Sequence, residues 1–336
     1  MAQLGARYHG TVEVVGSNPI DSTSGSIKLP LLFIFLLFLS LAFAEWRVVF
    51  DEEILSTALS MIKSARWEVL MVSFGVDHPE VIEALKMAKR RNVDVCVVTD
   101  DRAFCSLEHL VDAKPDSLMH EKWLLVDRRE VLVSTANFTH RGLKEDRNVA
   151  LVMDEEGIVD ALLEEFINFS KGFFSSEKTP VVRSGKNWKI FFAPGYDPLL
   201  EIVKVFEKAR WRILLCGYSF TDPQMTLLLK LLASRGLDVR LMLDAHWCER
   251  YAHEELSILR SGLKVRTFNG EGILHAKSIV VDRRWLILGS ANFTKSARFR
   301  NDEVVVIVED EEVAAKVEKW FMEIWEKLHE KARIAE

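Results

Sequence analysis

One arrangement of polar residues occurs twice in this chain. The second copy consists of His275, Lys277 and Asn292. The first copy has the same internal spacing and consists of His120, Lys122 and Asn137. Residues two apart on a β-strand point to the same face, so each copy projects an imidazole beside an ammonium. Together with an amide donor, these groups suit a phosphate, because the imidazole can transfer protons and the ammonium can hold negative charge.

The polar pattern belongs to a longer internal duplication. Residues 64–101 match residues 208–245 at a constant offset of 144, whereas the segments that start at His120 and His275 match at an offset of 155. The second copy therefore carries 155 − 144 = 11 additional residues. We place these residues in the predicted helical stretch Glu249–Arg260.

Hydrophobic periodicity predicts the same succession of elements in both copies. The predicted helices cover residues 51–64, 79–90, 155–170, 197–208, 223–235 and 311–330, with a short helix after each Asn-Phe-Thr. The predicted strands cover residues 67–74, 93–100, 147–153, 211–219, 238–244 and 303–309, with a hairpin-like pair around Asp127 and Asp282. Apolar strands that alternate with helices predict an α/β fold of two similar domains, each with a sheet flanked by helices.

The composition sets limits on the class of protein. The chain has 336 residues, of which 49% are hydrophobic and 28% charged, so a disordered chain and a polytopic membrane protein are excluded. The net charge of −6 excludes a globally basic nucleic-acid binder but allows a local basic site. Gln is scarce and charged residues are abundant, a bias that resembles proteins from hot environments. The four cysteines have no zinc-site spacing, and Cys105 and Cys248 are either a disulfide or two free thiols.

We expect the first domain at residues 45–170 and the second at 188–336, joined by a linker at 171–187 that contains Gly, Ser and Pro. Residues 27–44 hold an uncharged apolar run that ends in Ala-Phe-Ala. This run is shorter than the ~20 residues of a spanning helix and predicts a secretory signal peptide, with an uncleaved membrane anchor as the alternative. Either one predicts a protein that is secreted or held on the outer face of the cytoplasmic membrane.

Residues 1–26 show neither helical nor strand periodicity. Parts of this segment can be back-translated into the D-arm and T-arm sequences of a transfer RNA gene. We therefore expect translation to start near Ile27 or Leu29. The alternative is a genuine N-terminal tail.

The doubled pattern resembles the HKD signature of the phospholipase D superfamily, and the resemblance covers residues 46–336. It implies that both motifs meet across a pseudo-two-fold axis in one active site. One histidine would attack phosphorus and form a phosphohistidine, and the other would protonate the leaving oxygen and then activate water or an alcohol. The implied pair is His120 and His275. The implied phosphate ligands are Lys122, Lys277, Asn137 and Asn292.

The resemblance also has implications for cofactors and partners. No metal and no cofactor is expected, and a monomer already holds both half-sites, so no obligate protein partner is expected. The motif aspartates Asp127 and Asp282 are expected to be structural, near the hairpin turns. Which histidine is the nucleophile stays open, although the family habit favours the first.

Members of the family orient a motif histidine with a downstream carboxylate. Glu303 fits this role, and we expect it to accept the Nδ1 proton of His275. Asn148 stands at the matching place in the first copy. An amide supports an imidazolium less well than a carboxylate does, so we expect the two histidines to differ in basicity.

Further substrate contacts are expected beside the motifs, from Ser134, Thr135, Ser290, Arg141, Lys295 and Arg298. A cationic rim on an acidic protein suits a nucleic-acid backbone. The duplicated unit is also close in size to the small nucleases of the family, whereas lipid-acting members usually carry long extra loops or membrane helices. We therefore predict an exported endonuclease that acts on DNA or RNA. The alternative is a phospholipase D or phosphatidyltransferase that acts on phospholipid headgroups.

Overall fold

The computed structural model describes residues 46–335, with side chains through Leu328. The predicted N-terminal extension at 1–26 and the predicted signal segment at 27–44 lie outside the described residues. Within the described part of the chain, no helix combines the length and the apolar character that crossing a membrane requires.

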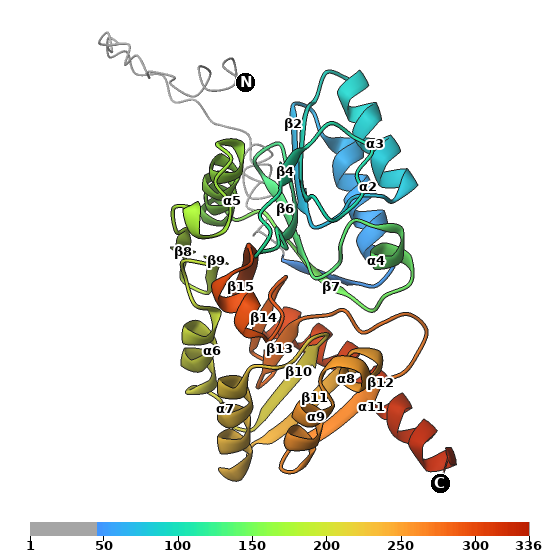
Figure 1. Ribbon diagram of the computed structural model, residues 1–336, viewed down its shortest axis with the longest axis vertical. Helices are drawn as coiled ribbons and strands as arrows, with labels where there is room; N and C mark the ends of the chain where they lie inside the picture. Colours follow the sequence, from blue (N-terminus) through green and yellow to red (C-terminus); the bar gives the residue numbers. More distant parts are fainter. Residues whose placement is uncertain (1–45, 336) are drawn as a thin grey trace, which may run out of the picture. The chain divides into compact units, whose positions relative to one another are not determined.

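The first half forms a seven-stranded mixed sheet in the order β1-β7-β6-β5-β2-β3-β4 (Figure 1). Its strands are β1 (Arg47–Phe50), β2 (Glu68–Ser73), β3 (Asp94–Asp100), β4 (Leu110–Asp112), β5 (Lys122–Val126), β6 (Glu130–Ser134) and β7 (Val149–Met153). Strand β2 pairs in parallel with β3 and antiparallel with β5, which makes the sheet mixed.

The second half repeats this order in an eight-stranded sheet, β12-β11-β10-β13-β14-β15-β9-β8. Its strands are β8 (Val182–Ser184), β9 (Trp188–Ala193), β10 (Arg212–Gly217), β11 (Asp238–Asp244), β12 (Lys264–Phe268), β13 (Ser278–Val281), β14 (Trp285–Gly289) and β15 (Glu303–Glu309). Here β10 pairs in parallel with β11 and antiparallel with β13, so the pairing of the first sheet recurs.

Helices cover both sheets. They are α2 (Glu53–Ser64), α3 (Pro79–Arg90), α4 (His140–Lys144), α5 (Glu156–Ser170), α6 (Pro198–Phe206), α7 (Pro223–Ser234), α8 (Ala245–Tyr251), α9 (His253–Arg260), α10 (Lys295–Phe299) and α11 (Glu311–Ala335). Apolar side chains of α2 and α3 form one core with the first sheet, and those of α6 and α7 form another with the second. A third core joins α5, α11 and strands of both sheets, so the two halves share buried apolar surface.

The predicted fold class is confirmed: two similar α/β halves each contain a mixed sheet flanked by helices. The additional residues of the second half form α8 and α9, which lie between β11 and β12, so their predicted position is confirmed. Strands β1 and β9, which pair with the equivalent strands β7 and β15, were not predicted. The predicted linker at 171–187 is only in part a connection, because it includes β8, which pairs with β9. All four cysteines are free thiols, so the Cys105–Cys248 disulfide is not formed.

The motif aspartates anchor two equivalent turns. Asp127 and its neighbour Arg128 both have positive φ, as a type I′ hairpin requires, and Asp282 and Arg283 repeat this geometry. The Asp127 carboxylate accepts hydrogen bonds from three consecutive backbone N–H groups, at 2.9, 2.9 and 3.0 Å. Burial opposes ionisation of Asp127, but these donors outweigh it and lower the pKa. Both aspartates thus hold the backbone at the hairpin turns where the sequence places them.

Replacing Asp282 with Ala should lower the free energy of unfolding by about 2–4 kcal/mol, because three backbone donors lose a charged acceptor. Urea titration measures the change. The exposed Asp116 provides the control, and Asp116→Ala should change stability by less than about 0.5 kcal/mol. Equal effects of the two substitutions would contradict the anchoring role.

Candidate active site

Backbone pairing between the halves brings the two motifs together. The His120 N–H donates to the Asp302 carbonyl (2.9 Å), and the His275 N–H donates to the Arg147 carbonyl (3.0 Å). Met119, which precedes His120, forms an isolated β-bridge with Asp302. Leu274, which precedes His275, forms one with Arg147. Glu303 follows Asp302 and therefore lies beside His120. Asn148 follows Arg147 and therefore lies beside His275.

This exchange of partners corrects the prediction for Glu303. Both carboxylate oxygens of Glu303 lie against Nδ1 of His120, at 2.9 and 2.8 Å, and not against His275. Glu303 comes from the second half, and His120 from the first. The carboxylate is completely buried, and its pKa is nevertheless lowered, because the charges of His120 and Lys122 outweigh the effect of burial. Glu303 is thus held as an anion that fixes the His120 tautomer with Nε2 free.

His275 has the neutral partner. Its Nδ1 lies 3.3 Å from Oδ1 of Asn148, and the Asn148 amide donates to the Gly142 carbonyl at 3.0 Å. The two histidines therefore differ in their Nδ1 partners, as predicted, but the partners are exchanged relative to the prediction. His120 has the carboxylate, and His275 has the amide.

Electrostatics place both motifs in one site. Burial lowers the pKa of His120 to about 4, against the opposing charge of Glu303. The pKa of His275 is also lowered well below its usual value, by burial and by the ammonium groups of Lys277 and Lys122. Burial lowers the pKa of Lys122 to about 7, and it also lowers that of Lys277. A bound phosphate anion would restore the charged form of these groups, so the site is organised for an anion.

Two aspartates at the ends of equivalent strands position the segments before the histidines. Asp100 at the end of β3 accepts from the N–H of Met119 (2.9 Å), and Asp244 at the end of β11 accepts from the N–H of Leu274 (3.0 Å). Burial raises the pKa of both carboxyl groups. The sequence showed these aspartates as a matching pair, and the structure adds their function as anchors of His120 and His275.

The small residues after each motif lie behind the histidines. Thr135 Oγ1 donates to Asn148 Oδ1 (2.8 Å), and the equivalent Ser290 Oγ donates to Glu303 Oε2. Ser134 Oγ accepts from the Ala136 N–H at 2.9 Å. All three are buried. The predicted substrate contacts of these three residues are therefore corrected. Thr135 and Ser290 hold the partners of the histidines, and Ser134 binds the backbone at Ala136.

Lys122 and Lys277, the expected phosphate ligands, each donate to the carbonyl of the histidine in their own motif, which fixes the ammonium beside the imidazole. The two motif asparagines are partly buried and close each half of the site. Asn292 Oδ1 accepts weakly from the Ser219 N–H (3.4 Å), whereas Asn137 Oδ1 is buried without a hydrogen-bond partner. Asn137 therefore has unused hydrogen-bonding capacity.

The cationic residues separate into two groups. Arg298 is buried and uses its guanidinium on Asp197 (2.8 and 2.5 Å) and on Asp222 (2.7 Å), so its predicted role in substrate binding is wrong. Arg141 and Lys295 are exposed on the short helices α4 and α10 that follow the motif asparagines. Arg141 has a single long ion pair with Asp146 (3.3 Å), so its guanidinium has donors available for a substrate.

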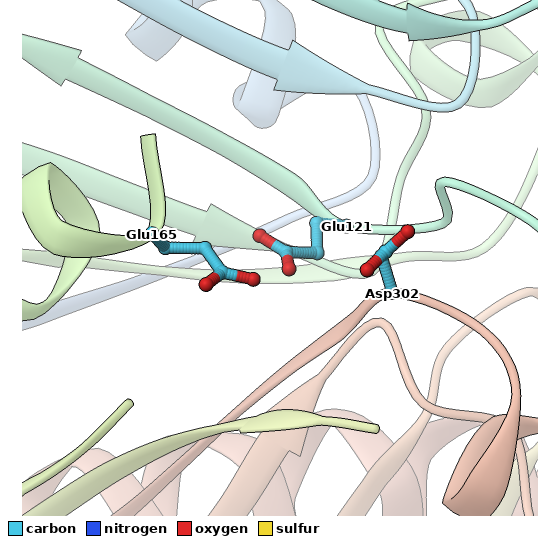
Figure 2. A group of neighbouring side chains, drawn as sticks. All are labelled: Glu121, Glu165 and Asp302. Carbon is cyan, nitrogen blue, oxygen red and sulfur yellow. The ribbon is translucent and has the colours of Figure 1, made fainter. Parts of the chain in front are cut away.

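A buried ionic cluster lies directly behind the His120 side of the site. Figure 2 shows the carboxylates of Glu121, Glu165 and Asp302 converging from three segments of the chain. The ammonium of Lys178, from the predicted linker, lies among them, at 2.7 Å from Asp302, at 3.4 Å from Glu121 and in contact with Glu165. Lys178 Nζ also donates to the Ala193 carbonyl (3.2 Å). The cluster thus ties together both halves and the segment between them.

Sequence reasoning missed this cluster. The three carboxylates are far apart along the chain, but their oxygens lie within 4.8 Å of one another in space. The Lys178 ammonium occupies the position among these carboxylates that a metal ion would need. Burial raises the pKa of Glu121 strongly and that of Asp302 to about 6, while the three carboxylates raise the pKa of Lys178 against the effect of burial. Glu121 and Asp302 are the sequence neighbours of His120 and Glu303, which is the one signal that could have suggested the cluster.

Comparisons with known proteins agree with this geometry. The family model described as the PLD-like domain of cardiolipin synthase matches residues 58–169 and 202–325. Mitochondrial cardiolipin hydrolase from Homo sapiens is 32% identical over 135 residues, which is 40% of this chain and 54% of that protein. Phospholipase D from Rickettsia prowazekii is 32% identical over 139 residues, which is 41% of this chain and 68% of that protein.

A solved structure shows the same fold over most of the chain. Phosphatidylserine synthase from Haemophilus influenzae superimposes with a TM-score of 0.60 at 14% identity and covers 82% of this chain and 84% of that one. The present chain spans about half the length of the mitochondrial cardiolipin hydrolases that it matches.

Exchanging the Nδ1 partners should shift the pH dependence of turnover. Glu303→Gln removes the anion beside His120 and should reduce kcat by about 10²–10⁴-fold. Asn148→Asp places an anion beside His275 and should raise its pKa, because a nearby carboxylate stabilises the imidazolium. The limb of the pH–rate profile at which His275 loses its proton should then move to higher pH. Steady-state profiles on one phosphodiester measure both effects.

A thermal melt of each variant is the control for folding. If Glu303→Gln keeps the wild-type rate while Asn148→Asp abolishes turnover in a folded protein, the assignment of partners is incorrect.

Removing the buried ammonium should destabilise the fold in a pH-dependent way. Lys178→Met leaves three buried carboxylates without a cation and should cost about 3–5 kcal/mol near neutral pH. The pKa values of these carboxyl groups in the folded variant would lie above their unfolded values, so stability is lost as the pH rises. The deficit should therefore shrink as the pH is lowered toward about 4.

Urea unfolding at several pH values measures the deficit. Lys204→Met is the matched control, since Lys204 is an exposed lysine paired with Glu201, and the unfolding midpoint of this variant should stay at the wild-type value. A Lys178→Met deficit that does not depend on pH would contradict the ionic explanation.

Proposed function

The chain belongs to the phospholipase D superfamily, and on this premise we propose that it is a phosphodiesterase that cleaves the backbone of DNA or RNA through a phosphohistidine. The observation that carries the mechanism is the unequal pairing of the two buried imidazoles. His120 is bonded to the Glu303 anion, and His275 to the neutral Asn148 amide.

His120 is the nucleophile in this mechanism. Its Nδ1–H donates to Glu303, so the lone pair of Nε2 faces the phosphate. Attack forms the N–P bond, and the P–O bond to the leaving group breaks. The imidazole gains positive charge as it bonds to phosphorus, and the Glu303 carboxylate stabilises that charge. Lys122 and Lys277 hold the negative charge on the phosphate oxygens.

His275 is the acid and then the base. Its low pKa makes it a strong acid once a bound phosphate has favoured the protonated form, so it can deliver a proton to the departing oxygen. The neutral imidazole that remains takes a proton from water, and the resulting hydroxide attacks phosphorus. The N–P bond then breaks and returns His120 to its starting state.

Exposed cations on both sides of the site support a nucleic-acid substrate. Arg141 and Lys144 extend from the α4 side and Lys295 from the α10 side, and all three are exposed. A polyanionic backbone that crosses the site would contact both groups through its neighbouring phosphates. The predicted export segment at 27–44 supports action outside the cytoplasm.

A second candidate is a phospholipid substrate. The similar proteins from Homo sapiens and Rickettsia prowazekii are named a cardiolipin hydrolase and a phospholipase D, which favours a lipid phosphodiester. The same pair of histidines would perform the same two steps on a lipid headgroup. The two candidates therefore differ in what binds around the phosphate and not in the chemistry.

Turnover of several substrates in parallel tests the proposal. Single-stranded DNA, RNA, cardiolipin vesicles and phosphatidylcholine vesicles should be compared in the presence of EDTA. We expect the nucleic acids to be cleaved faster than the lipids and EDTA to leave the rate unchanged, because lysines and asparagines hold the phosphate.

His120→Ala and His275→Ala should each remove most activity, since each histidine has its own task in one site. Faster turnover of either lipid would replace the nuclease proposal with the second candidate. Near-wild-type turnover by either variant would contradict the shared site.

A further inference from the structure

Three aromatic rings lead outward from His275. The ring of Tyr218 lies 5.1 Å from the His275 ring, that of Trp247 lies 5.2 Å from Tyr218, and that of Tyr251 lies 4.7 Å from Trp247, all measured between centroids. We call Tyr218, Trp247 and Tyr251 the aromatic ladder. Aromatic rings at these separations are in favourable contact, so the ladder is a continuous surface.

The ladder becomes more exposed with distance from the catalytic imidazole. His275 is buried, Tyr218 and Trp247 are partly buried, and Tyr251 is 56% exposed. Tyr218 directly follows β10, whereas Trp247 and Tyr251 lie on α8, within the segment that is longer in the second half. The ladder thus connects the phosphate site to solvent on the His275 side.

The described residues of the first half do not repeat this feature. Phe74 corresponds to Tyr218 and lies 6.1 Å from His120 in an edge-on contact. If the offset of 144 is continued two residues past the matched segments, Ala103 stands opposite Trp247, and the exposed Phe104 follows it. The ladder therefore marks the His275 side of the site, the same side on which Asn148 stands in place of a carboxylate. With His275 as the acid, that side is the one from which the leaving group departs.

The charges beside the ladder favour a neutral flat ligand. The ammonium of Lys277 lies 5.4 Å from the centroid of Tyr218, and the guanidinium of Arg250 lies 5.2 Å from that of Tyr251. Both ends of the ladder thus already face a cation, and a cationic headgroup placed there would meet like charge. A nucleobase is uncharged and flat, and its phosphates would be attracted by the same two cations.

We propose that the aromatic ladder is a stacking subsite for the nucleobase on the leaving-group side of the scissile phosphodiester. The inference rests on the proposed nuclease function and adds a preference for single-stranded nucleic acid. Bases in a duplex are already stacked on their neighbours, whereas an unpaired base is free to lie against Trp247 and Tyr251.

The test compares cleavage of a labelled single-stranded oligonucleotide with that of a copy in which one nucleotide is abasic. Stacking on an aromatic side chain contributes about 1–3 kcal/mol per base, which corresponds to about 5- to 150-fold in kcat/KM. The wild-type protein should cleave more slowly, by this factor, at the bond whose leaving-group nucleoside lacks its base. Trp247→Ala should slow cleavage of the intact strand by a similar factor and should remove the effect of the abasic nucleotide.

Tyr251→Ala provides a second variant at an exposed position that is not needed for folding, with a smaller loss in the same direction. Trp211→Ala is the matched control. Trp211 is an exposed tryptophan of the same half, at the opposite end of β10 from Tyr218, and its replacement should leave kcat/KM unchanged. A thermal melt of each variant verifies folding, and a duplex of the same sequence should be cleaved more slowly than the single strand.

The outcomes distinguish a failure of the proposed subsite from a failure of the proposed nuclease function. If Trp247→Ala and Tyr251→Ala cleave like the wild type and keep its sensitivity to the abasic nucleotide, the subsite is wrong and the nuclease function stands. If both variants lose phosphatidylcholine turnover and keep oligonucleotide cleavage, the ladder binds the trimethylammonium headgroup and the inference is overturned. If the wild-type protein cleaves no oligonucleotide, the proposed function itself fails.

Discussion

The site depends on the exchange of strand partners between the two halves. Two imidazoles and two ammonium groups are withdrawn from water in one place, and such groups are stable only where partners and hydrogen bonds offset the lost hydration. The backbone bonds from His120 to Asp302 and from His275 to Arg147 place the start of β15 beside one histidine and the start of β7 beside the other. Neither half can provide this arrangement alone, so the shared core is also the condition for the chemistry.

A duplicated fold builds two equivalent half-sites, whereas the two histidines have different tasks in the proposed reaction. Here the inequality arises from a single pair of equivalent positions, Glu303 and Asn148. The hydroxyls that support them, Ser290 and Thr135, are themselves equivalent. The groups behind the Nδ1 partners are therefore alike in the two halves. The partners themselves differ, and the carboxylate beside His120 stabilises a positive charge on that imidazole better than the amide beside His275 does.

Much of this molecule follows from local pattern. Helix α3 and strand β15 have the bounds that periodicity predicts, and the doubled motif identifies the histidines and lysines of the site. The partner of Glu303 could not be predicted from sequence, because proximity along the chain suggests His275, and only the pairing of distant strands brings Glu303 to His120. Lys178 was missed for the same reason, since its three carboxylates come from separate segments and meet only in the folded chain.

The two features that sequence reasoning missed lie on opposite sides of the site. Behind His120, the cluster around Lys178 is completely buried and joins three segments, so the imidazole of the proposed nucleophile has little freedom to move. Beyond His275, the aromatic ladder opens toward solvent and ends at the exposed Tyr251. A nucleophile gains from a fixed position, because its reacting atom must align with phosphorus, whereas a leaving group needs a path out. The surroundings and the Nδ1 partners thus differ between the two sides in the same sense, and both support the proposed attack by His120 and the proposed departure on the side of His275.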